Sequence, residues 1–230
     1  MLFVLTNVKK GDILMSWREQ PRDRLGRWTE FSKLDYIYDS ESPHIYLDGG
    51  NNKDKPTPIT DRAIFAVPFV HPEGYSLEEA YLIREQHREL LKYARDHNNE
   101  REVAFVFREG LRDRSIIHGD ATSVNLTYAL DGKGYNIFVM HNHPANKSFS
   151  TNDIITFIHL SEIKSISIVK HTGAIEVISK TKKYDKSAFD IEFKRNFKKY
   201  CKNNSLQSMD KAIMQTLLKN GGMVEWKKLC

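Results

Sequence analysis

Residues 135–144 are Tyr135-Asn136-Ile137-Phe138-Val139-Met140-His141-Asn142-His143-Pro144, an apolar run that ends in two histidines. The apolar part, residues 135–140, predicts a buried strand that leads directly into His141. A helix is predicted next, over residues 150–160, and two strands follow at 165–170 and 174–179. A helix between strands indicates an α/β or α+β fold, in which helices cover a sheet.

Upstream of this stretch, the sequence predicts further strands and a long helix. Ser76 and Glu79 have the spacing of a capping box, so a helix should begin there and continue to about residue 96. Its predicted inward residues include Leu82, Leu90, Tyr93 and Ala94. Apolar runs predict strands at residues 63–70, 102–107 and 115–118. A short helix at 124–130 and a glycine turn at 131–134 are predicted before the central run.

The chain is predicted to have three parts. Residues 1–60 form an irregular accessory segment, residues 61–184 form the central domain, and residues 185–230 form a helical C-terminal extension. Within the extension, Phe189, Phe193 and Phe197 recur every four residues and predict an apolar helix stripe. A second helix is predicted at 209–219, with Gly221-Gly222 as its stop.

The composition is that of an ordinary globular protein. The 230 residues are 40% hydrophobic and 28% charged, which excludes disordered and fibrous classes. No apolar run approaches the roughly 20 residues that a membrane span needs, and residues 1–5 are too short for the core of a signal peptide. The two cysteines, Cys201 and Cys230, give neither a disulfide framework nor a zinc-ligand spacing. We therefore expect a cytoplasmic, reduced location and no membrane partner.

Two histidines and an aspartate form a candidate metal site. Side chains two apart on an extended strand point to the same side, so His141 and His143 can bind one ion. Asp153, in the first turn of the predicted helix, can bring a carboxylate back to them. Two imidazoles and a carboxylate leave a fourth tetrahedral position for water, which is typical of catalytic zinc (Zn²⁺). Each histidine alone would more often be structural, and the spacing of the three residues favours the metal interpretation.

Glu102 and Ser150 are the candidate catalytic residues. Glu102 opens the predicted strand 102–107 and could take a proton from the metal-bound water and pass it to a leaving amine. Its competitors, Glu100 and Glu109, fall in a polar loop and a turn. Ser150 could donate a hydrogen bond to an oxyanion. With Asp153 three residues on, Ser150 also fits an ordinary helix N-cap, and the two roles are compatible.

These residues together resemble the signature of the JAB/JAMM (MPN-type) zinc metalloproteases. That signature is a strand glutamate, then His-x-His-Pro, then Ser-x-x-Asp, and here it is matched by Glu102, His141-Asn142-His143-Pro144, Ser150 and Asp153. The tetrapeptide is also similar to the RadC branch and to JAB domains of phage and bacterial conflict systems. The resemblance covers about residues 61–180. The spacing from His143 to Ser150 is one residue shorter than is most usual in the family.

The resemblance implies a curved mixed sheet flanked by helices and a peptidase or isopeptidase activity, which in some members removes ubiquitin-like proteins. A protein or peptide, ubiquitin-like in some members, is the implied substrate. Residues 20–28 are similar to a short linker in some phage head-morphogenesis and prophage proteins, which favours a phage-related origin.

Two other classes of function stay open. A metal-dependent phosphoesterase or nuclease is disfavoured, because few histidines follow His143 and because the His and Asn of an HNH nuclease do not form one tripeptide. A non-catalytic binding or assembly module would keep the fold without the reaction. The net charge of +5 and the basic residues of the 180–202 stretch suggest nucleic acid or an acidic protein as a partner. A solvated helix face is the favoured interpretation of that stretch.

Overall fold

The computed structural model describes residues 46–48, 56–108, 110–111, 113–121, 123–126, 130, 136–200 and 206–230, all of which lie in the compact unit His44–Cys230. Most of the predicted accessory segment 1–60 therefore lies outside the described residues. The phage-like stretch 20–28 lies wholly outside them. Within the described residues, no helix is both long and apolar enough to cross a membrane.

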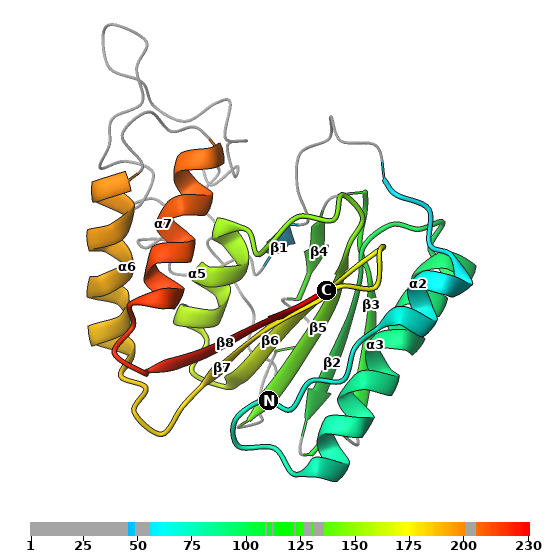
Figure 1. Ribbon diagram of the computed structural model, residues 1–230, viewed down its shortest axis with the longest axis horizontal. Helices are drawn as coiled ribbons and strands as arrows, with labels where there is room; N and C mark the ends of the chain where they lie inside the picture. Colours follow the sequence, from blue (N-terminus) through cyan, green and yellow to red (C-terminus); the bar gives the residue numbers. More distant parts are fainter. Residues whose placement is uncertain are drawn as a thin grey trace, which may run out of the picture. The chain divides into compact units, whose positions relative to one another are not determined.

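A mixed sheet of six strands forms the centre of the described unit (Figure 1). Its strand order is β3-β2-β5-β6-β7-β8, and every neighbouring pair is antiparallel except β5 and β6, which are parallel. A second sheet pairs β1 with β4. The strands are β1 (Tyr46–Asp48), β2 (Val103–Arg108), β3 (Asp113–His118), β4 (Ser123–Asn125), β5 (Ile137–His143), β6 (Ile163–Lys170), β7 (Ile175–Lys180) and β8 (Val224–Leu229).

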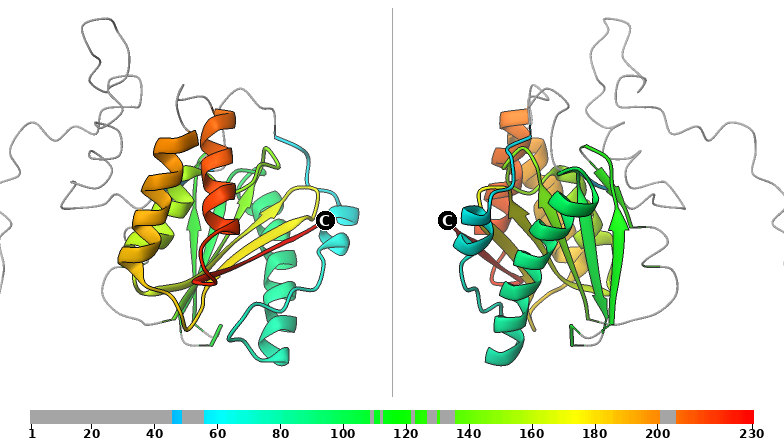
Figure 2. Two further views of the ribbon diagram at one scale, coloured as in Figure 1. Left: turned by 60° about the vertical axis from the view of Figure 1, so that its left-hand side comes forward. Right: turned by 90° about the vertical axis from the view of Figure 1, so that its right-hand side faces the viewer.

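Helices cover both faces of the six-stranded sheet, which gives an α+β arrangement (Figures 1 and 2). On one face, α3 packs against β2 and β5 and α2 packs against α3. On the other face, α5 lies against β6, and α6 and α7 pack against α5 and each other. The helices are α2 (Asp61–Ala66), α3 (Leu77–His97), α5 (Thr151–His159), α6 (Lys186–Tyr200) and α7 (Leu206–Leu218).

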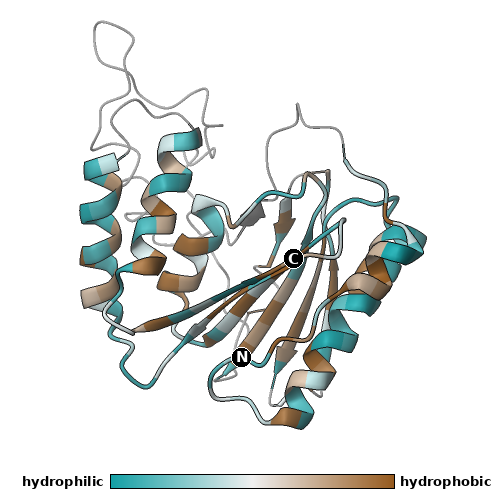
Figure 3. Cartoon of the chain, viewed as in Figure 1, coloured by the Kyte–Doolittle hydropathy of each residue, from teal (hydrophilic) through white to brown (hydrophobic). Residues whose placement is uncertain are grey.

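The alternation of side chains along the strands gives the two faces different contents. Phe105 and Met140 pair across β2 and β5 and belong to the hydrophobic core under α3. Their neighbours Ala104 and His141 also pair, and they point to the face that α5 covers. The central strands are largely hydrophobic, whereas the helices carry both hydrophobic and hydrophilic residues (Figure 3). The α3 face is therefore a packing core, and the α5 face receives the histidines.

The predicted capping box begins α3. The Ser76 hydroxyl accepts a hydrogen bond from the Glu79 N–H at 3.1 Å, and the Glu79 carboxylate accepts one from the Ser76 N–H at 2.7 Å. Leu90 and Ala94 are buried as predicted, and Tyr93 is partly buried. The prediction for Leu82 was wrong, because 42% of this residue is exposed.

The strand predicted at 63–70 is instead helix α2 followed by irregular chain. The Thr60 hydroxyl caps the helix by accepting from the Ala63 N–H at 3.1 Å, and Asp61 lies in the first turn, where a negative charge is favourable. Pro68 restricts the preceding residue to extended conformations, so the helix ends there. An apolar run this short fits a buried strand or a buried helix equally well.

The helix predicted from residue 124 was also wrong at its start, because Ser123–Asn125 form β4. Strand pairing decides this local structure: Val124 pairs with Leu47, far away in the sequence. The rest of that stretch and the glycine turn at 131–134 lie largely outside the described residues.

The C-terminal extension is not wholly helical. Phe189, Phe193 and Phe197 of α6 are buried as the stripe predicted, and α7 follows. Gly221 and Gly222 then adopt left-handed φ values of 65° and 80°, which glycine tolerates. They turn the chain back along β7, so that residues 224–229 become β8 at the sheet edge. The extension thus completes the central sheet.

The buried residue His87 makes the stability of the fold depend on pH. Its Nδ1 donates to the Ile83 carbonyl at 2.8 Å, and its Nε2 accepts from the Ser167 hydroxyl at 2.8 Å. Burial lowers the pKa of His87 from 6.5 to about 4. The unfolded chain therefore binds the proton more readily, and the stability that neutral His87 contributes is complete above pH 6.5 and is lost as the pH falls toward 4.

We expect urea unfolding to show that this loss amounts to at most about 3 kcal/mol between pH 7 and pH 4. The pKa values of His143 and His171 are lowered as well, so the wild type alone does not isolate the contribution of His87. The comparison is therefore with His87→Gln, whose side chain cannot be protonated. The variant should be less stable than the wild type at pH 7, and the difference should shrink toward pH 4. A difference that does not change with pH contradicts the assignment.

Candidate metal centre

His141 and His143 lie on β5, a central strand between β2 and β6. The strand continues through both histidines, beyond the predicted end at Met140. Their side chains share the face covered by α5, and both residues have no exposed surface. The sheet therefore holds the two imidazoles side by side on a rigid support.

Asp153 reaches the histidines from the first turn of α5. Ser150 is the N-cap of this helix: its hydroxyl accepts from the Asp153 N–H at 3.1 Å, and its own N–H donates to Oδ2 of Asp153 at 2.6 Å. This reciprocal pair fixes both the helix start and the orientation of the carboxylate. Asp153 is also fully buried.

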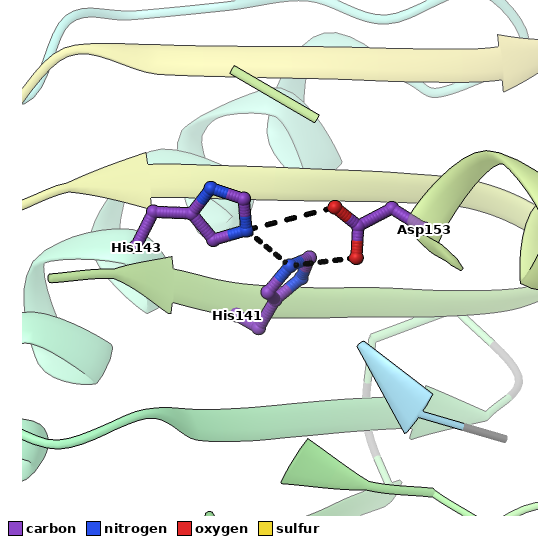
Figure 4. A group of neighbouring side chains, drawn as sticks. All are labelled: His141, His143 and Asp153. Atoms are coloured by element: carbon purple, nitrogen blue, oxygen red, sulfur yellow. Dashed lines mark hydrogen bonds and ion pairs between the residues drawn. The ribbon is translucent and has the colours of Figure 1, made fainter. Parts of the chain in front are cut away.

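The three side chains converge on one point (Figure 4). Nε2 of His141 lies 3.3 Å from Oδ1 of Asp153, and Nε2 of His143 lies 3.6 Å from Oδ2. The two Nε2 atoms are 2.8 Å apart. One possible ligand atom from each residue lies within 4.8 Å of the others, so the group could bind a metal ion.

The protonation states suit a cation. Nδ1 of His143 faces the Lys147 carbonyl at 3.1 Å and so carries the proton, which leaves the Nε2 lone pair directed at the other ligands. Burial and the neighbouring His141 lower the pKa of His143 to about 4, so this imidazole is neutral at neutral pH. Burial alone would raise the pKa of Asp153, but the two histidines and the Ser150 N–H hold it below its ordinary value.

Two buried atoms of the group, Nδ1 of His141 and Oδ1 of Asp153, have no hydrogen-bond partner among the described residues. Buried acceptors without a hydrogen bond are rare because the lost hydration is costly. A cation at the convergence point would supply the interaction that Oδ1 lacks, so the residues present fit a metal ion.

Glu102 lies on the same face of the sheet, immediately before β2. Ala104 pairs with His141, and Glu102, two residues before Ala104, falls on the same side of the chain by the alternation of side chains. Glu102 has no exposed surface, and its backbone is held by hydrogen bonds with Asp120 and Gly119. The predicted general base is therefore buried on the face of the sheet that holds His141 and His143. It is not one of the three residues whose ligand atoms converge.

Asn142 forms a supporting network that the sequence did not predict. Its side chain points to the opposite face, where Oδ1 accepts from the Val103 N–H at 2.7 Å and Nδ2 donates to the Arg101 carbonyl at 3.1 Å. Nδ2 also donates to His171, whose Nδ1 donates to the Thr57 carbonyl. Asn142 therefore holds the backbone on both sides of Glu102. Its position between the two histidines was the only sequence signal.

Glu176 on β7 was missed as well. It is fully buried, and although burial raises its pKa, hydrogen bonds from Lys170 and Ser148 hold the pKa below its ordinary value. A single charged residue inside the apolar run Ile175-Glu176-Val177-Ile178 was the signal that could have identified it.

No protein-family model, curated protein or solved structure matches the chain. The geometry of His141, His143 and Asp153 and the sequence motif that contains them are therefore the observations that bear on function.

We expect the purified protein to carry about one divalent metal ion per chain, measured by inductively coupled plasma mass spectrometry. The double variant His141→Ala/His143→Ala should lose the ion, because a single carboxylate ligand remains. His118→Ala is the matched control, since His118 is exposed and its side chain hydrogen-bonds only to Tyr93 among the residues described. A folded wild type that takes up no metal even after reconstitution would falsify the assignment.

Proposed function

We propose that the chain is a zinc-dependent peptidase or isopeptidase of the JAB/JAMM type. The observation that carries the proposal is the convergence of His141, His143 and Asp153 in a buried group, with Glu102 on the same face of the sheet. The resemblance of these residues to the family signature supports it.

Zinc is the metal that this ligand set favours. Two neutral imidazoles and one carboxylate are typical of catalytic zinc sites, which keep a fourth position open. When bound, zinc lowers the pKa of a coordinated water to near 7 and so makes a nucleophile available at neutral pH. The harder ions Mg²⁺ and Ca²⁺ prefer sites made of oxygen ligands alone.

Glu102 is assigned the proton transfer. Its carboxylate, buried on the face of the sheet that holds the histidines, takes the proton released when water attacks a peptide or isopeptide carbonyl, and then delivers it to the leaving amine. Asn142 holds the backbone on both sides of Glu102 against the strand that carries the proposed ligands.

Ser150 is assigned to the oxyanion. Its hydroxyl oxygen accepts the Asp153 N–H, and a hydroxyl that accepts one hydrogen bond still has a hydrogen to donate. Capping the helix and stabilising the oxyanion are thus compatible for this residue. The proposed substrate is a protein or peptide, with ubiquitin-like conjugates as one class to test, and a phage-related origin is part of the proposal.

Glu102→Gln should lower hydrolysis about 100- to 10,000-fold while zinc stays bound, because the amide keeps the shape of the side chain and cannot accept the proton. The assay uses fluorogenic peptides and Gly–Lys ε-amino isopeptides with the zinc-loaded protein.

Glu100→Gln is the control for this variant, since Glu100 accepts from the Ile59 N–H and has no role in the proposed reaction. Full activity in Glu102→Gln contradicts the role of Glu102. Zinc without any hydrolysis in the wild type favours a non-catalytic binding module, and cleavage of a phosphodiester favours a phosphoesterase or nuclease.

Ser150→Gly separates capping from catalysis. Glycine is a tolerable N-cap, so the variant should lose only a few tenths of a kcal/mol of stability in thermal unfolding. Hydrolysis should fall about 100- to 1,000-fold, because the donor to the oxyanion is gone. Equal activity in Ser150→Gly and wild type would leave Ser150 as a cap alone.

A further inference from the structure

Glu176 is a buried carboxylate with three cationic or hydroxyl donors around it. Its Oε1 is 2.8 Å from Nζ of Lys170 and 3.2 Å from Nζ of Lys228. Its Oε2 accepts a hydrogen bond of 2.6 Å from the Ser148 hydroxyl. The two oxygens thus have separate partners: one binds the lysines, and the other binds the loop between β5 and α5.

The carboxylate lies on the face of the sheet that carries the metal group. Glu176 pairs with Ile168 of β6, and Ile168 pairs with His141 of β5. Lys170, which binds Glu176, pairs with His143 in the same register. Neighbouring residues in register on adjacent strands point to the same side, so Glu176 and the ligand histidines share one layer under α5.

The loop that Glu176 binds is the one that orients the metal ligands. Lys147, immediately before Ser148, provides the carbonyl that accepts the Nδ1 proton of His143 at 3.1 Å. Ser150, two residues after Ser148, caps α5 and binds the Asp153 carboxylate. One hydrogen bond at Ser148 therefore fixes a segment with a ligand-orienting contact on each side.

We propose that Glu176 is a positioning residue for the metal centre, acting through Ser148. By holding the loop, it keeps the Lys147 carbonyl on Nδ1 of His143, so that Nε2 stays directed at the metal position. Such contacts behind a ligand histidine commonly contribute about 10- to 100-fold to metal affinity. The inference rests on the proposed metal site and adds how the affinity of that site is set.

The lysines suit this role. An ionised carboxylate accepts shorter and stronger hydrogen bonds than a neutral group, and two ammonium groups on Oε1 keep Glu176 ionised although it is buried. Lys228 comes from β8, so the C-terminal strand contributes to the surroundings of a centre formed mainly by β5 and α5.

A purely structural role for Glu176 would be to neutralise the lysines in the sheet. The two roles predict different effects on zinc. Ser148→Ala removes the loop contact and keeps the lysine contacts, whereas Lys228→Gln removes a lysine and keeps the loop contact. If Glu176 acts through the loop, only the first change should weaken zinc binding.

The test is the zinc dissociation constant of the full chain, measured by competition with a chromophoric chelator. Ser148→Ala and Glu176→Gln should each raise it about 10- to 100-fold. Because both substitutions remove the same interaction, the dissociation constant of the double variant should be no higher than that of the weaker-binding single variant. Lys228→Gln should stay within about twofold of the wild type. Ser161→Ala is the matched control, since Ser161 donates to Glu162 beyond the far end of α5.

An unchanged constant in Ser148→Ala, an equal loss in Lys228→Gln, or additive losses in the double variant overturns the proposal, and so does a wild type that binds no zinc. If Glu176→Gln fails to fold, Ser148→Ala with its two controls decides. The readout does not depend on hydrolysis. A wild type that binds zinc and cleaves nothing refutes the peptidase proposal, and the zinc dissociation constants of the variants still decide the role of Glu176.

Discussion

The parallel pairing of β5 with β6 is the constraint on which the centre depends. Two parallel neighbours cannot be joined by a tight turn, so the chain must cross over the sheet between them, and here it does so as α5. Since α5 begins only a few residues after β5 ends, its N-terminus lies at the same end of the sheet as the last residues of β5. Asp153, in the first helical turn, therefore meets His141 and His143, which lie on the last residues of the strand. The other neighbouring pairs of this sheet are antiparallel and build the support on either side.

A second constraint is the burial of polar groups in the middle of an apolar sheet. A buried polar or charged side chain is costly unless its hydrogen-bonding groups have partners. Asn142 uses both ends of its amide, and Glu176 uses both oxygens. The group of His141, His143 and Asp153 is the exception, since Nδ1 of His141 and Oδ1 of Asp153 have no hydrogen-bond partner among the described residues. This contrast within one layer of side chains is the physical argument for a cation.

The two faces of the sheet have different roles. Under α3, Phe105, Phe138 and Met140 pack into a hydrophobic core that supports the fold. Under α5, the same sheet presents His141, Glu102 and Glu176. A side chain on β5 thus lies either in the packing core or in the layer of buried polar residues, so substitutions at adjacent positions affect different parts of the structure. Asn142 lies between His141 and His143 in the sequence, but its side chain points to the α3 face. There it forms hydrogen bonds with the backbone of Arg101 and Val103.

The sequence by itself determined what depends on nearby residues. The capping boxes Ser76/Glu79 and Ser150/Asp153, the phenylalanine stripe of α6 and the spacing of the two histidines are local patterns, and each predicted structure that the fold contains. Only the tertiary structure decided β4, which depends on pairing with β1, and β8, which depends on β7. It alone revealed the supporting roles of Asn142 and Glu176, which act through hydrogen bonds that span 28 to 41 positions of the chain. Hydrogen bonds over such separations exist only once the chain has folded, so no local pattern encodes them.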